Sequence, residues 1–184
     1  NGGCEEHLES PVKLNGKRFS GKEYLLCCYR ENCLYNTVWM YAYKRSYLEH
    51  YHLRFVEGIL HEDVEFIMRS LLNVNVMIKA EVFPYHYRVR PGSISTQERK
   101  EKNVRDLFWV LREQEKLAEM QEPELRRWMK DAILNSYLSM IQEVKIYRPE
   151  YRKYYSREFL FGKAITRRNR FRVMLCACSP RLYC

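Results

Sequence analysis

The sequence has 184 residues, a length that fits one domain or one domain with a helical appendage. Its 46% hydrophobic and 30% charged residues are ordinary for a folded protein and exclude a disordered or collagen-like chain. No apolar run approaches the roughly 20 residues that span a bilayer, and no basic-then-apolar segment opens the chain. We therefore expect a cytoplasmic protein that neither crosses a membrane nor is secreted.

The first predicted elements are short. A helix is predicted over residues 21–29. Residues 37–43 are aromatic and β-branched, which predicts a strand, and a helical turn is expected near residues 46–50.

Longer periodic segments follow. Residues 62–73 repeat apolar side chains at the spacing of an amphipathic helix. Residues 75–90 then change to a period of two, which predicts one or two strands. Two apolar stripes after Gly92 predict a pair of helices, the second beginning near Pro123, that pack as an antiparallel hairpin.

Positive charge is concentrated near the end of the chain. The net charge is +9, and the last 34 residues hold nine lysines and arginines against one acid, a net charge of +8. Bulky apolar residues mix with arginines over residues 159–176, as in segments that lie in a membrane interface. A final helix that packs on the domain with its arginines in water predicts the same pattern, and the sequence leaves both interpretations open.

The seven cysteines do not indicate a metal site. They are odd in number and lack the paired Cys-x-x-Cys spacing of zinc sites. We expect reduced thiols, with Cys27 and Cys28 on a buried helix face, and no metal ligands in this chain.

Glu62 and Asp63 begin the predicted amphipathic helix. Acids are favoured in the first turn of any helix, because free N–H groups and the helix dipole stabilise negative charge there. The functional alternative is that Asp63 stays ionised and takes a proton from a hydroxyl nucleophile. The neighbouring Glu62 carboxylate would then raise its affinity for that proton.

Arg88 and Arg90 alternate on the last predicted strand, so their side chains project to one face. The following turn adds the N–H and the hydroxyl of Ser93. Two guanidiniums beside such a turn could bind a diphosphate. The alternative is that both arginines lie on a solvent-exposed face of the strand and bind nothing.

These residues belong to a series of motifs. In chain order the motifs are Trp39, Lys44-Arg45, Phe55-x-Glu57-Gly58, Glu62-Asp63 and Tyr87-Arg88-x-Arg90-x-x-Ser93-Ile94. Together they resemble the second half of bacterial family 2 glycosyltransferases with the GT-A fold, over about residues 20–95. The resemblance implies an α/β fold in which residues 1–95 form the acceptor-side half, with few strands plus helices. A helical hairpin (96–148) and a basic, aromatic helical tail (149–184) follow it.

The resemblance also implies an activity. It is the inverting transfer of a sugar from a nucleotide-diphosphate donor to a hydroxyl of a saccharide or lipid-linked acceptor, as in surface polysaccharide synthesis. Asp63 is implied as the general base, with Glu62 beside it. The implied substrate-binding residues are Arg88, Arg90 and Ser93 for the donor diphosphate, and Trp39, Glu57 and Gly58 for the sugar and acceptor pocket.

One part of the family pattern is missing. The nucleotide-binding half of the family carries an Asp-x-Asp motif that holds Mg²⁺ or Mn²⁺, and these 184 residues contain neither that motif nor a glycine-rich phosphate loop. The chain is then either a C-terminal fragment or a truncated homologue that has lost donor binding. The abrupt start at Asn1 favours a fragment that is inactive alone, the divalent metal being bound elsewhere in the full-length enzyme.

The alternative from another class is a non-catalytic module. Such a module would dock on a partner protein or, through the basic tail, on the anionic inner face of a membrane as a peripheral protein. The 15 tyrosines among basic residues suggest RNA binding, since aromatic rings stack on bases. The positive charge is not spread along one surface, however, so no nucleic-acid partner is expected. The sequence does not predict an oligomeric state.

Overall fold

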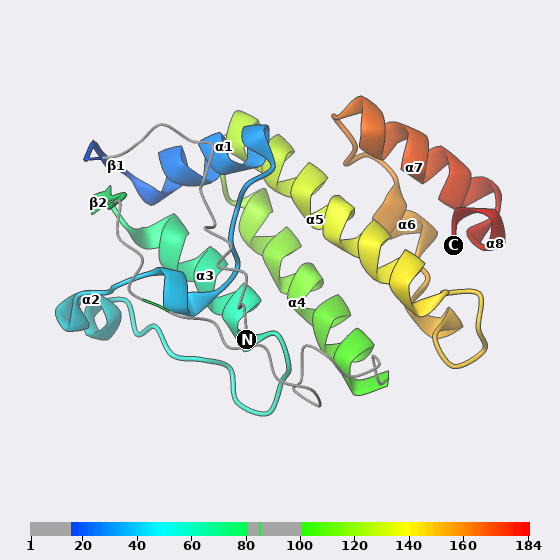
Figure 1. Cartoon of the computed structure of the whole chain (residues 1–184), viewed down its shortest axis with the longest axis horizontal. Helices are drawn as coiled ribbons and strands as arrows, with labels where there is room; N and C mark the ends of the chain where they lie inside the picture. Colours follow the sequence, from blue (N-terminus) through cyan, green and yellow to red (C-terminus); the bar gives the residue numbers. More distant parts are fainter. Residues whose placement is uncertain (1–15, 81–84, 86–100) are drawn as a thin grey trace, which may run out of the picture.

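The computed structural model describes residues 16–80, 85 and 101–184 and is mostly helical (Figure 1). Two short strands, β1 (Arg18–Phe19) and β2 (Met77–Ile78), form an antiparallel sheet. The helices, in chain order, are α1 (Gly21–Glu31), η1 (Val38–Met40), α2 (Arg45–His50), α3 (Glu62–Asn73), α4 (Glu101–Glu119), α5 (Pro123–Val144), η3 (Arg152–Tyr154), α6 (Arg157–Leu160), α7 (Arg167–Cys178) and α8 (Pro180–Tyr183). Helices beside a small sheet agree with the coarse prediction of a mixed α/β protein.

The N-terminal part joins α1 closely to α3. Ser20 caps α1, because its hydroxyl accepts the N–H of Glu23 while the Glu23 carboxylate accepts the N–H of Ser20. The Gly21 N–H donates to the carbonyl of Val74 at 2.9 Å. A Cβ on Gly21 would lie 1.9 Å from the carbonyl oxygen of Leu71, so only glycine permits this approach. The predicted helices over residues 21–29 and 62–73 are confirmed.

The predicted strand over residues 37–43 is wrong. These residues form η1 and an extended segment instead. Their aromatic rings pack against helices, Tyr41 edge-on to Tyr24 and Tyr43 edge-on to Phe66. Strand propensity reflects how well a side chain fits a half-buried surface, and here that surface is helical. Of residues 75–90, the structure describes β2, whose Met77 pairs with Phe19; most of the remainder lies outside the described residues.

The predicted hairpin of α4 and α5 is confirmed. Pro123 occupies the first turn of α5, as expected from its fixed φ angle. The stripes that face each other include Val104, Leu111, Met129 and Ile133, each at most 2% exposed. In Figure 1, α3, α4, α5 and α7 lie side by side in that order, and α1 packs against α3 and α5.

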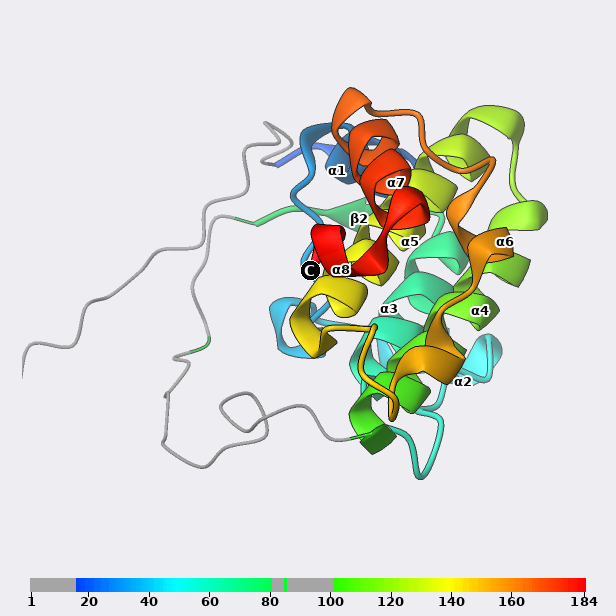
Figure 2. The ribbon, with the colours of Figure 1, turned by 90° about the vertical axis from the view of Figure 1, so that its right-hand side faces the viewer.

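The C-terminal segment folds back onto α5 (Figure 2). The buried Asp131 carboxylate accepts the N–H groups of Ile165 and Thr166 at 2.7 and 3.2 Å, and so fixes the start of α7. Tyr137 donates its hydroxyl to the carbonyl of Tyr154 at 2.9 Å. One hydrophobic core contains side chains from the three predicted segments, from Phe19 in the first to Tyr183 in the last. Among the helices described, none has the length and apolarity that crossing a bilayer requires.

Candidate functional site

Asp63 lies in the first turn of α3, where the sequence predicts it. His61 precedes the helix in a left-handed conformation (φ 64°) and provides no side-chain cap. Asp63 supplies an acceptor at this helix end, because its Oδ1 accepts the N–H of Val64 at 2.8 Å. Glu62 is exposed, whereas Asp63 is partly buried. The two acids therefore share a helix end but differ in their access to water.

The pKa of Asp63 is raised above the ordinary carboxyl value. Burial is the largest cause, and the carboxylate of Glu62 adds to it. The N–H of Val64 and the imidazole of His61 act in the opposite direction and lower the pKa. The sequence suggested the effect of Glu62, but burial, the larger effect, requires the tertiary structure. A carboxylate with a raised pKa binds a proton more tightly, which favours work as a base.

The loop that leads to Asp63 is held by the first turns of α4. Lys102 donates its ammonium group to the carbonyl of Gly58 at 2.8 Å. The N–H of Leu60 donates to Asp106 Oδ2 at 3.0 Å, and the ring of His61 hydrogen-bonds to Asn103 Oδ1 at 3.0 Å. Three contacts over four residues fix this loop to α4.

Asp106 is the centre of that attachment. Its side chain is 5% exposed and also forms ion pairs with Lys102 and Arg105. Burial would raise the pKa of Asp106, but the hydrogen bonds from Lys102, the Leu60 N–H and Arg105 together lower it. The sequence contains the i, i+4 pair of Lys102 and Asp106 as a signal. It contains no signal that the same carboxylate binds a loop more than 40 residues away.

The remaining predicted site residues divide into two groups. Glu57 and Gly58 are exposed in the loop, with Gly58 at a φ of 78°. Trp39 lies in η1, which packs against α3, and its indole stacks on Tyr85 with ring centroids 4.6 Å apart. Arg88, Arg90 and Ser93 lie outside the described residues. Their approach to Asp63 stays a prediction.

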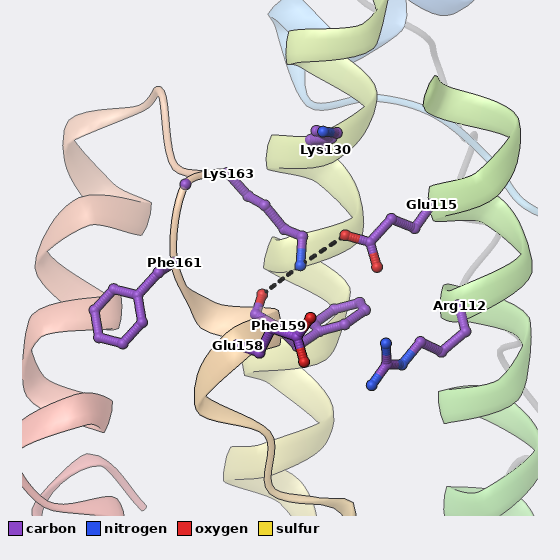
Figure 3. Close-up of a pocket in the computed structure, with 8 residues that line it drawn as sticks. Arg112, Glu115, Lys130, Glu158, Phe159, Phe161 and Lys163 are labelled. Atoms are coloured by element: carbon purple, nitrogen blue, oxygen red, sulfur yellow. Dashed lines mark hydrogen bonds and ion pairs between the residues drawn. The ribbon is translucent and has the colours of Figure 1, made fainter. Parts of the chain in front are cut away.

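Two cavities lie elsewhere in the molecule. One, of about 280 Å³, lies between α1, α5 and the start of α7 and includes Trp128 and Arg168. The other, of about 220 Å³, lies between α4, α5 and the segment after α6 (Figure 3). Neither of these two is lined by Asp63, Glu62, Trp39, Glu57 or Gly58.

The smaller cavity contains a buried lysine that the sequence did not single out. Figure 3 shows Lys163 directed toward Glu115, with Nζ 2.8 Å from Oε1, and toward the carbonyl of Phe159, also at 2.8 Å. The ammonium group lies 3.8 Å from the centroid of the Phe159 ring. Burial lowers the pKa of Lys163, and the Glu115 carboxylate opposes that shift. The Lys163 ammonium group is paired with Glu115 of α4, so this side chain joins α4 to the segment before α7.

The described residues contain no group of three or more His, Cys, Asp or Glu side chains that could hold a metal ion. Comparisons of the chain with protein-family models, with curated proteins and with solved structures found no match.

Proposed function

We propose that this chain is the acceptor-side part of an inverting glycosyltransferase of the GT-A type. In this proposal a nucleotide diphosphate-sugar is the donor, and a hydroxyl of a saccharide or lipid-linked molecule is the acceptor. The observation that carries the proposal is Asp63, a partly buried carboxylate with a raised pKa at the start of α3, behind a loop fixed by α4.

The proposed step needs one proton acceptor in a defined position. Asp63 removes the proton from the acceptor hydroxyl as its oxygen bonds to the anomeric carbon and the bond to the diphosphate breaks. The nucleotide diphosphate leaves with the bonding electrons, and the proton stays on Asp63. Fixing the Gly58–Leu60 segment through Lys102 and Asp106 supports the step, because a base is effective only when it is held within hydrogen-bond reach.

Trp39 and Tyr85 support the proposal independently. Their stacked rings bring the aromatic residue of the first motif next to the start of the segment that carries Arg88, Arg90 and Ser93. In the proposal that segment binds the donor diphosphate. The nucleotide and its divalent metal require residues beyond these 184, since no Asp-x-Asp occurs among them.

The test is an assay of the protein encoded by the complete reading frame. It is incubated with a panel of nucleotide diphosphate-sugars and of saccharide and lipid-linked acceptors, and acceptor-dependent release of nucleotide diphosphate is measured. We expect release with at least one donor and formation of a product with inverted anomeric configuration. No release across the panel, together with no Asp-x-Asp in the preceding roughly 100 residues, about half an α/β domain, would overturn the proposal.

A further inference from the structure

The outer face of α7 combines apolar and basic side chains. Residues on an α-helix are about 100° apart, so Arg167, Phe171, Met174 and Cys178 share one face. All four are exposed, and the side chains of Phe171 and Met174 are 58% and 53% exposed. Exposed large apolar residues on a regular stripe are unusual for a helix that packs on a domain.

The opposite face of α7 holds the helix in place. Asn169, Val173 and Cys176 are buried against the rest of the molecule. Asn169 donates its amide to the Asp131 carboxylate at 2.9 Å, and Arg172 donates to Asn135 on α5 at 2.5 Å. The exposed stripe of Phe171 and Met174 therefore belongs to a helix that is held to the rest of the molecule by its other face. Figure 2 shows α7 beside α5.

Arginines flank the stripe on both sides. Arg168 and Arg170 are exposed on the two sides of the stripe, each roughly 70–90° around the helix from the direction opposite the buried face. The sequence of α7 contains four arginines and no acid. Three of them lie in its first four residues, where the helix dipole disfavours positive charge. Folding alone does not favour this placement, so a role in binding an anionic surface accounts for it better.

We propose that the outer face of α7 docks on an anionic membrane surface. Phe171 and Met174 insert among the lipid acyl chains near the headgroups, and Arg167, Arg168 and Arg170 contact lipid phosphates. Leu182 on α8, 80% exposed, adds apolar area at the end of α7. Lipid is favoured over a protein partner because arginines and exposed apolar residues alternate on one helix without an acid. The last 34 residues, which include this helix, have a net charge of +8. This proposal does not depend on sugar transfer.

The test is co-sedimentation of the full chain with vesicles of phosphatidylcholine alone or with added phosphatidylglycerol. We expect binding to the anionic vesicles that weakens as salt is added, and little binding to phosphatidylcholine. Phe171→Ser/Met174→Ser should lower the partition coefficient by about tenfold or more, because two large apolar side chains no longer leave water. Arg167→Glu/Arg168→Glu should abolish the preference for anionic lipid.

Matched control variants distinguish binding through this face from nonspecific binding to vesicles. Met120→Ser changes an exposed apolar residue in the α4–α5 turn, and Arg127→Glu changes an exposed arginine on α5. Both should bind vesicles as the unaltered chain does, and circular dichroism should show that every variant is folded. Equal recovery of the unaltered chain in the supernatant with and without vesicles would overturn the proposal. So would equal binding by the Phe171/Met174 variant, or a chain that self-associates through this face without binding lipid.

Discussion

The backbone N–H of Leu60 donates to the carboxylate of Asp106 at 3.0 Å, which joins the loop before Asp63 to α4. A backbone group of one segment is thus satisfied by a buried side chain of another, 46 residues later in the chain. The position of the proposed base depends on α4 as well as on its own helix.

Asp106→Asn should destabilise the protein by about 1.5–3 kcal/mol, the usual value for hydrogen bonds to a charged group. The pKa of Asp106 is lowered on folding, so its carboxylate stabilises the fold above the ordinary carboxyl pKa. That stability is lost as pH falls through the lowered value. Urea unfolding of the unaltered protein and of the Asp106→Asn variant, at neutral and at strongly acidic pH, measures this change in the free energy of unfolding. A difference in the free energy of unfolding that is equal at both pH values would contradict the role given to Asp106.

Asp63→Asn should have the opposite effect on stability. The pKa of Asp63 is raised on folding, so its contribution to stability is present at low pH and declines as pH rises through the ordinary and then the raised carboxyl pKa. The amide carries no charge to desolvate and still accepts the Val64 N–H. We expect the variant to be more stable at neutral pH by about 0.5–2 kcal/mol, as is common when a functional group is removed. Thermal melting from acid to neutral pH measures this gain. A variant less stable than the unaltered protein at neutral pH would show that Asp63 is structural.

Lys163→Met should destabilise the protein because it leaves the Glu115 carboxylate without its partner. The cost should fall somewhat below the roughly 3–5 kcal/mol of a fully buried pair, since the Glu115 side chain is 22% exposed. Adding Glu115→Gln removes the unpaired charge and should recover most of the loss. A double-mutant cycle by urea denaturation measures the coupling.

The control for Lys163 is the neighbouring pair of Lys130 and Glu119, in which the Glu119 side chain is 53% exposed. Lys130→Met should cost no more than about 1 kcal/mol. If the Lys163 and Glu115 substitutions changed the free energy of unfolding additively, the ion pair between them would not stabilise the fold, which would contradict the role given to Lys163.

Local signals predicted the helices well. The amphipathic spacing in residues 62–73 and the position of Pro123 anticipated the start of α3 and of α5, because both signals depend on neighbours in sequence. The aromatic residues around Trp39 led to the wrong prediction of a strand over residues 37–43, since the same residue types suit a strand or a segment packed on helices. The contacts of Asp106 and Lys163 could not be predicted, because their partners are brought together by tertiary packing.

The most direct measurement for Asp63 as the general base is single-turnover sugar transfer by the complete protein carrying Asp63→Asn. Loss of a general base typically costs 10²–10⁴-fold in rate, and we expect a loss of about that size with donor affinity unchanged. Glu113→Gln, which alters a partly exposed acid of α4 that pairs with Lys116, should transfer at the normal rate. Transfer by the Asp63 variant within a few-fold of normal would contradict the assignment of Asp63 as the base.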